Sequence, residues 1–278
     1  MEYSGPGADL GPLHCLATEL DAGILTIALN RPEQKNRIDV ALSLELEKLL
    51  RAVAADSAVR VVVLRGQGEG FCAGLDAQDF ADTARHGDTA LRAARASAQA
   101  WRTRLLRLLP QPVIAVVHGF CEGEACAILE SCDIVLAAED TRFSLPQEDT
   151  GGCTTGTVAK AASRVIAQRA ADYYALTGRS FDGREAERNG LATRSVPPAS
   201  LDAEAQALAG ELAAKDDIAL RFTKETLLHV GAMSWDGVLS FTAAKFAELK
   251  ALQAGRPSAR AAAVESFLAG KSKPGLGN

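Results

Sequence analysis

Two glycine-bearing turns are the parts of this sequence best suited to stabilise a developing negative charge. Residues 70–76 read Gly-Phe-Cys-Ala-Gly-Leu-Asp, and residues 118–125 read His-Gly-Phe-Cys-Glu-Gly-Glu-Ala. Each turn follows a run that predicts a strand and enters a predicted helix. Amides at a helix start lack a helical acceptor and carry partial positive charge, so two that converge form an oxyanion hole. Either turn alone is more simply a tight connection.

Few side chains near these turns suit proton transfer. Glu124, Glu148 and Asp149 are carboxylates at or after the turns, and a carboxylate in an apolar pocket makes an effective acid or base. A solvated turn is the competing interpretation of Glu148 and Asp149. His118, at the end of a predicted strand, and His229, near the end of a predicted helix, are further candidates with structural roles as the simpler interpretation.

The cysteines indicate neither a disulfide framework nor a metal centre. No pair has CxxC spacing, and no histidine or carboxylate completes a plausible ligand set around them. We therefore expect reduced thiols, of which those near residues 121–132 pack as small apolar side chains. The six are Cys15, Cys72, Cys121, Cys126, Cys132 and Cys153.

The elements that must position the turns form an alternating strand and helix pattern. Runs rich in β-branched residues predict strands buried on both faces. Helices between consecutive strands indicate right-handed parallel crossovers. The predicted strands are two within 16–30, then 59–64, 112–117 and 132–137, and the helices among them are 40–54, with Asp39 as N-cap, a long region ending near 109, and 123–131.

Beyond Thr155 the chain is almost entirely helical in pattern. A short apolar link near 192–196 interrupts the helices. We expect a loose N-terminus over 1–13, an α/β core over 14–200 and a helical region over 201–278. The predicted helices are 158–176, 183–189, 201–214, 218–230, 235–254 and 257–268.

Composition excludes several classes of protein. The 278 residues carry 30 basic and 35 acidic side chains, a net charge of −5, and no block of like charge. No nucleic-acid partner is therefore expected. No apolar stretch reaches the roughly 18 residues of a membrane span, so no membrane partner is expected either. The N-terminus lacks a signal pattern, and we expect a cytoplasmic protein.

Several motifs, in this order, resemble the crotonase (enoyl-CoA hydratase/isomerase) superfamily over about residues 16–277. They are Asn30-Arg31-Pro32-Glu33 with Asn36, Ala73-Gly74-Leu75-Asp76, His118-Gly119 with Gly123-Glu124-Ala125, Cys132-Asp133, and Phe143-Ser144-Leu145-Pro146. Further stretches resemble the hydroxycinnamoyl-CoA (feruloyl-CoA) hydratase-lyase branch. These include Trp101 with Leu105-Leu106-Arg107, Asp172-Tyr173-Tyr174, Trp235, and the ending from Phe267 to Leu276.

The resemblance implies an α/β fold, a crotonase-like spiral of ββα turns with two roughly perpendicular sheets and a C-terminal helical region that mediates trimerisation. Homotrimers that can pair into hexamers are therefore expected. The implied substrate is an acyl-CoA or acyl-carrier-protein thioester, whose oxygen would lie between the amides of Leu75 and Glu124. Coenzyme A would enter only as part of the substrate, with no other cofactor. The residues implied to contact it are Asn36 and Arg37 along the pantetheine, and Ala73, Asp76 and Ala77 near the adenine. Lys245 is a candidate phosphate partner, with an ordinary surface lysine as the simpler interpretation.

The sequence departs from the family pattern at the residues that transfer protons. Hydratases of this family use two glutamates, and the corresponding positions hold Ala127 and Gln147. Two tyrosines of the hydratase-lyase branch correspond to Phe80 and, approximately, Ala243. The glycine-rich oxyanion turn reads Gly123-Glu124-Ala125, which indicates either a turn that is already helical or one of different shape.

Three functions follow from this combination. The first is a lyase- or hydratase-type reaction on an acyl thioester, with Glu148, Asp149 or Glu124 as a relocated acid or base. The second is a decarboxylase or other enolate chemistry that needs little acid–base help. The third is an acyl-CoA-binding subunit without turnover.

Overall fold

The computed structural model describes residues 3, 5, 10–145, 155–255 and 259–270. The chain divides into two compact units, Met1–Ala214 and Lys215–Asn278.

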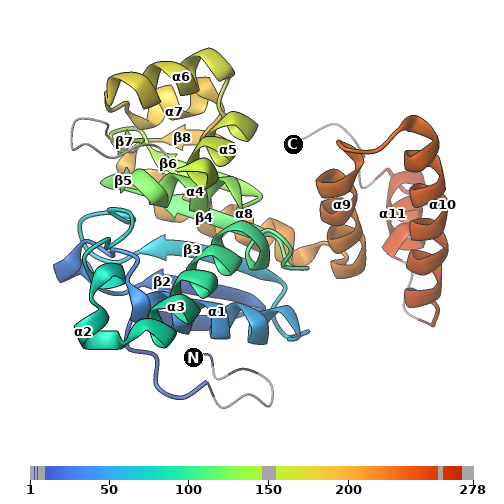
Figure 1. Cartoon of the computed structure of the whole chain (residues 1–278). Helices are drawn as coiled ribbons and strands as arrows, with labels where there is room; N and C mark the ends of the chain where they lie inside the picture. The colour runs from blue at the N-terminus through green and yellow to red at the C-terminus, as the bar shows by residue number, and fades with distance from the viewer. Residues whose placement is uncertain (1–2, 4, 6–9, 146–154, 256–258, 271–278) are drawn as a thin grey trace. The chain divides into compact units, whose positions relative to one another are not determined.

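A six-stranded sheet forms the centre of the first unit (Figure 1). The strand order is β1-β2-β3-β4-β6-β8; β1 and β2 are antiparallel, and every other neighbouring pair is parallel. The parallel crossovers inferred from the sequence are thus confirmed. The strands are β1 (Leu16–Asp21), β2 (Ile24–Leu29), β3 (Val61–Gly66), β4 (Val113–Val117), β6 (Ile134–Ala138) and β8 (Arg194–Val196).

The central strands are buried on both faces because their side chains alternate between two apolar clusters. Val62 and Leu64 of β3 belong to the larger cluster, which also contains the apolar face of α1 (Val40–Ala54). Val61 and Val63 face the opposite way and pack with Leu201, Ala205 and Ala209 of α8 (Leu201–Ala214). Asp39 caps α1 as predicted, since its carboxylate accepts a hydrogen bond from the Leu42 amide at 2.8 Å.

Helix α8 belongs to the first unit, so the boundary between units lies after Ala214 rather than at Ser200 as expected. The physical reason is burial. Leu201, Ala205 and Ala209 complete the second apolar cluster, and α8 contacts β3, β4 and β6. The first unit would leave that face of its sheet exposed without α8.

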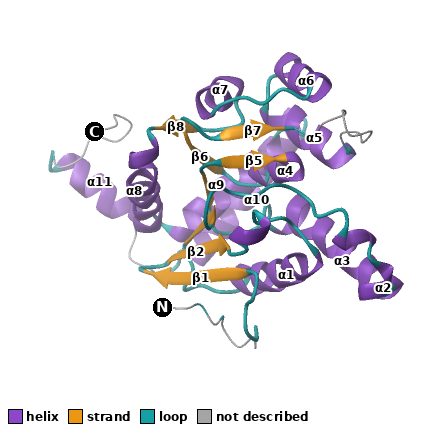
Figure 2. Ribbon diagram, turned by 90° about the vertical axis from the view of Figure 1, so that its left-hand side faces the viewer, coloured by secondary structure: helices purple, strands orange, loops and turns teal. Residues whose placement is uncertain are grey.

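A second, two-stranded sheet pairs β5 (Phe120–Glu122) with β7 (Arg142–Ser144) in parallel. The sequence did not predict either strand, because three residues are too few to show a period. Figure 2 shows these strands beside α4, α5 and the α6–α7 pair. The remaining helices of this unit are α2 (Thr83–His86), α3 (Asp88–Ala100), α4 (Cys126–Glu130), α5 (Gly156–Val165), α6 (Gln168–Thr177) and α7 (Gly183–Asn189).

Two helical predictions need correction. The predicted helix 158–176 is two helices, α5 and α6, because Ile166 is extended, with ψ of 137°. The long region before residue 109 is also broken. Helix α3 ends at Ala100 and is followed directly by a π-helix over Trp101–Leu105. There the Leu106 amide donates to the Trp101 carbonyl at 3.1 Å.

The second unit is helical, as predicted. It contains α9 (Asp217–Val230), α10 (Trp235–Leu252) and α11 (Ala259–Leu268). Asp216 and Ser234 cap the first two helices through hydrogen bonds to the Ala219 and Gly237 amides. Within the part of the chain that the structure describes, no helix has the length and apolar character needed to cross a membrane.

Candidate active site

The two glycine turns singled out from the sequence lie against each other. Their backbones pair through Cys72 and Cys121, and the Glu122 amide donates to the Cys72 carbonyl at 3.0 Å. Gly74, with φ of +85°, faces the second turn. A Cβ on Gly74 would lie 2.9 Å from the Glu122 oxygen and 3.4 Å from the Glu124 nitrogen. Gly74, the residue before Leu75, therefore lies beside the backbone of Glu122 and Glu124.

Leu75 forms a short parallel β-bridge with Ile38, and the hydrogen bonds of this bridge do not use the Leu75 amide. The neighbours of Leu75 make the bonds of this bridge: the Ile38 amide donates to the Gly74 carbonyl at 2.8 Å, and the Asp76 amide donates to the Ile38 carbonyl at 2.9 Å. Leu75 itself donates to no acceptor among the described residues. Its N–H is therefore available to a ligand.

Glu124 lies in a turn that is already helical. Gly123 has φ of +56°, and residues 123–125 form a 3-10 turn that leads directly into α4. The Glu124 amide belongs to the first turn, where no preceding carbonyl of the helix can accept it. Only Gly123 needs the left-handed conformation, so a glutamate is tolerated at the next position. The first of the two shapes considered for this turn is the one observed.

The carboxylate of Glu124 is already engaged. Arg102 Nη1 lies 3.0 Å from Glu124 Oε2, and Thr155 Oγ1 lies 3.0 Å from Oε1. The Arg102 and Glu124 side chains are only 10% and 13% exposed. Both carboxylate oxygens thus already have a partner within the protein, which weakens the hypothesis that Glu124 transfers protons.

Only some of the remaining proton-transfer candidates lie among the described residues. Ala127, at the position of the first family glutamate, is buried among apolar side chains. Gln147, Glu148 and Asp149 lie outside the described residues, so their roles stay predictions. Cys72 does not replace them, because burial raises the pKa of its thiol to about 12.

His118 is structural, in agreement with the simpler interpretation. Its Nε2 donates a hydrogen bond to the Gly68 carbonyl at 2.9 Å. His229 lies in the second unit with its ring centroid 6.3 Å from that of Phe241. The backbone carbonyl of His118, the first residue of the second turn, also accepts a hydrogen bond from the Phe71 amide of the first turn at 3.1 Å.

The loop predicted to line pantetheine is held by a buried asparagine. Asn36 is 1% exposed and has φ of +53°. Its Oδ1 accepts from the Arg31 amide at 2.9 Å, and its Nδ2 donates to the carbonyls of Gln67 at 2.8 Å and Gly70 at 3.0 Å. The side chain thus fixes the loop and the start of the first glycine turn together.

The neighbours of Asn36 reach the surface. Arg37 is exposed, and its side chain has no recorded partner among the described residues. Ala73 and Asp76 are partly buried, and Ala77 is exposed. The Ala73 amide donates to the Lys35 carbonyl at 3.0 Å, which brings this loop beside the first glycine turn. Their predicted contacts with coenzyme A remain predictions.

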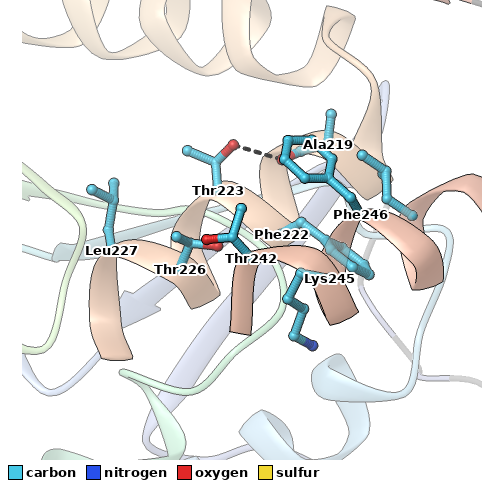
Figure 3. A pocket seen from close by; sticks show the side chains of 9 residues that line it. Ala219, Phe222, Thr223, Thr226, Leu227, Thr242, Lys245 and Phe246 are labelled. Atoms are coloured by element: carbon cyan, nitrogen blue, oxygen red, sulfur yellow. Dashed lines mark hydrogen bonds between the residues drawn. The ribbon is translucent and has the colours of Figure 1, made fainter. Parts of the chain in front are cut away.

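Lys245 lies in the second unit, at a groove of about 300 Å³ between α9 and α10 (Figure 3). Its ammonium pairs with Glu225 at 2.9 Å and Glu248 at 3.0 Å, and it lies 4.9 Å from the centroid of the Phe222 ring. Hydrogen bonds to both glutamates raise the pKa of Lys245. Two carboxylates already compensate its charge, and its part in phosphate binding stays a prediction.

Sequence reasoning missed a second group of charges beside the glycine turns. Glu130, at the end of α4, has a side chain only 1% exposed and pairs with both Arg107 and Arg164, the latter at 2.8 Å. With the Arg102–Glu124 pair, the segment from Glu124 to Glu130 holds two largely buried carboxylates in three ion pairs. Partners separated by more than 20 residues leave no periodic signal, so only the tertiary structure reveals them.

Residues 19–254 match the family model for enoyl-CoA hydratase/isomerase, and the chain belongs to that family, the crotonases. It has the crotonase fold expected from its motifs. The putative enoyl-CoA hydratase of Streptomyces coelicolor A3(2) superposes with a TM-score of 0.84 at 27% identity, covering 99% of each chain.

Two curated relatives illustrate the range of the family. The chain is 32% identical over 260 residues to the hydroxycinnamoyl-CoA hydratase-lyase of Pseudomonas fluorescens, covering 93% of this chain and 94% of the relative. It is 30% identical over 248 residues to the human mitochondrial Delta(3,5)-Delta(2,4)-dienoyl-CoA isomerase, covering 82% and 74%.

Proposed function

We propose that this protein binds an acyl-CoA or acyl-carrier thioester and stabilises the enolate oxygen with the amides of Leu75 and Glu124, in a hydratase- or lyase-type reaction. The packing of Gly74 against the Glu124 nitrogen carries the proposal, because it brings the two donor-bearing turns into contact. A preorganised donor of this kind contributes on the order of 3 kcal/mol. The chemistry needs no cofactor besides the coenzyme A of the substrate.

The second candidate is enolate chemistry with little acid–base assistance, such as decarboxylation. The buried Ala127 favours it, since no carboxylate occupies that position. A non-catalytic acyl-CoA-binding subunit is the third. Turnover separates the third candidate from the first two, and product identity separates the first two from each other.

A panel of acyl-CoA and carrier-bound thioesters, including carboxylated ones, tests the proposal. Mass spectrometry in D₂O would follow exchange of α-hydrogens, and calorimetry would follow binding. We expect saturable binding and exchange with at least one thioester. Failure of every thioester to bind would refute the proposal.

A pair of variants tests the amide itself. Leu75→Pro removes the N–H, whereas Leu75→Ala keeps it and shortens only the side chain. We expect exchange to be lost in the first variant and retained in the second, with circular dichroism confirming that both are folded. Equal exchange in both would exclude the Leu75 amide as a donor.

We also propose that the chain forms a homotrimer or hexamer through its helical region. Large apolar side chains are exposed on α9, α10 and α11, and water contact with so many of them is unfavourable. They are Leu227, Trp235, Leu239, Phe246, Leu252, Val264, Phe267 and Leu268.

A further inference from the structure

The glutamate in the second glycine turn creates an electrostatic problem for the proposed function. Its carboxylate is attached to the residue whose amide would bind the enolate oxygen. A negative charge one side-chain length from that oxygen opposes the charge that develops there. Glu124 must therefore be neutralised if its amide is to stabilise an anion.

The burial and contacts of Arg102 suit it to neutralise that charge. It is 8% exposed, and three contacts fix it. Its Nε donates to the Ala98 carbonyl at 2.9 Å, its own carbonyl accepts from the Ser131 hydroxyl, and its Nη1 meets Glu124 Oε2 at 3.0 Å. A guanidinium held in this way has little freedom to turn away from the carboxylate.

The π-helix over Trp101–Leu105 places Arg102 at this point. A π-helix widens the hydrogen-bonding ring, because each amide bonds five residues back and not four. The Leu106 amide accordingly bonds to Trp101, and the Ser131 hydroxyl bonds to the Arg102 carbonyl. Single π-turns of this kind are frequent at functional sites.

Thr155 supports the same charge from the opposite side. Its hydroxyl lies 3.0 Å from Glu124 Oε1, and Thr155 is the N-cap of α5. The partial positive charge at the start of this helix also favours a carboxylate. Both carboxylate oxygens of Glu124 therefore have a partner.

We infer that Arg102 is a positioning residue that cancels the charge of Glu124 and so allows the Glu124 amide to serve as an oxyanion donor. This inference rests on the proposed function. Glu124 then acts through its backbone, and its side chain holds the turn without transferring a proton. Arg102 contacts Glu124 and not the substrate.

A double-mutant cycle on thioester turnover tests the inference in the full-length protein. Arg102→Met leaves the Glu124 carboxylate without its cation, and we expect kcat to fall on the order of 10- to 100-fold with a smaller change in KM, since only the transition state carries the new charge. Adding Glu124→Gln removes the offending charge and should restore kcat to within about threefold of the wild-type value. Arg102→Lys keeps the charge and should retain most activity.

A matched control separates charge cancellation from general damage. Arg107→Met also removes a partly buried arginine from an ion pair with a glutamate of α4, Glu130. Any loss of activity in this variant should not be recovered by Glu124→Gln. If Arg102→Met does not fold, Arg102→Gln, which can still donate to Glu124 without a charge, replaces it in the cycle.

The outcomes are distinguishable. Active wild-type protein with no recovery in the double variant, or with unchanged kcat in Arg102→Met, overturns the role of Arg102 alone. Loss of turnover in Glu124→Gln by itself overturns it too, because turnover would then require the charge that Arg102 is inferred to cancel. Wild-type protein that neither binds nor turns over any thioester overturns the proposed function and this inference together.

Discussion

Gly74 lies beside the amide nitrogen of Glu124 and so close to the Glu122 carbonyl that no side chain fits at Gly74. A Cβ at Gly74 would lie 3.4 Å from that nitrogen and 2.9 Å from the neighbouring Glu122 oxygen, and the backbone at Gly74 is left-handed. The two turns are thus held at a separation that only glycine permits.

Gly74→Ala should therefore separate the turns. We expect a destabilisation of about 1–3 kcal/mol from the left-handed conformation, and a larger relative loss of kcat because both proposed donors move. Urea unfolding and thioester turnover measure the two effects. Gly87→Ala is the control, since it has a similar φ of +75° but nothing within 4 Å of its added Cβ. Equal losses of kcat in both variants would contradict the importance of the contact.

Asn36→Ala should be among the most destabilising polar substitutions. It leaves one backbone amide and two carbonyls without their partner, and we expect a loss of about 2–4 kcal/mol in the free energy of unfolding. Asn36→Asp keeps the acceptor for the Arg31 amide but sets a carboxylate against the two carbonyls. Denaturant unfolding should show both variants to be impaired, and a change below about 0.5 kcal/mol in either would contradict this role.

Asp79 should contribute stability that disappears in acid. Its burial would raise its pKa, but hydrogen bonds from His86 and the Val40 amide outweigh burial and lower it. The contribution is therefore present above the unfolded-state pKa of about 3.9 and is lost as the pH falls through the lower folded-state value. Asp79→Asn, which cannot titrate, should lose less stability than the wild type when urea unfolding is repeated from pH 6 to pH 3. Parallel curves for the two proteins would contradict the prediction.

The whole chain should have the mass of three or six copies of 29.2 kDa by light scattering. Leu239 and Phe246, exposed by 67% and 65%, lie on one face of α10, and the double variant Leu239→Glu/Phe246→Glu should shift the protein towards smaller species. Ala244→Glu adds a charge on the opposite face of the helix and serves as the control. A monomeric wild type would refute the proposed assembly.

The sequence could reveal the frame of the fold because its signals are local. The β-branched run of β3 and the leucines of α1 repeat within a few residues, and both glycine turns follow directly from strands that can be recognised. Strands β5 and β7 were not predicted, because three residues are too few to show an alternating pattern. The packing of α8 against the first unit was not predicted either. The apolar face of this helix indicates that it is buried, but not which surface buries it.

The candidate site was predictable only in its backbone. Glycines mark the two turns in the sequence, and the resemblance to the crotonases points to Leu75 and Glu124 within them. The partner of the Glu124 side chain could not be identified from the sequence. Arg102 lies 22 residues away, in a π-helix that no local sequence pattern predicts. Charge pairs formed across a fold become visible only after the elements are packed.

The π-helix also constrains how this chain can change by insertion or deletion. Removing one residue from 103–105 would return the segment to an α-helical repeat and rotate everything after it by about 100°. Arg107 would then turn away from Glu130, and the Leu106 side chain would leave the apolar cluster it now occupies. A descendant of this protein with one residue fewer in 103–105 would need different side chains to pack beside α4. The length of this segment is therefore as restricted as the identity of its arginines.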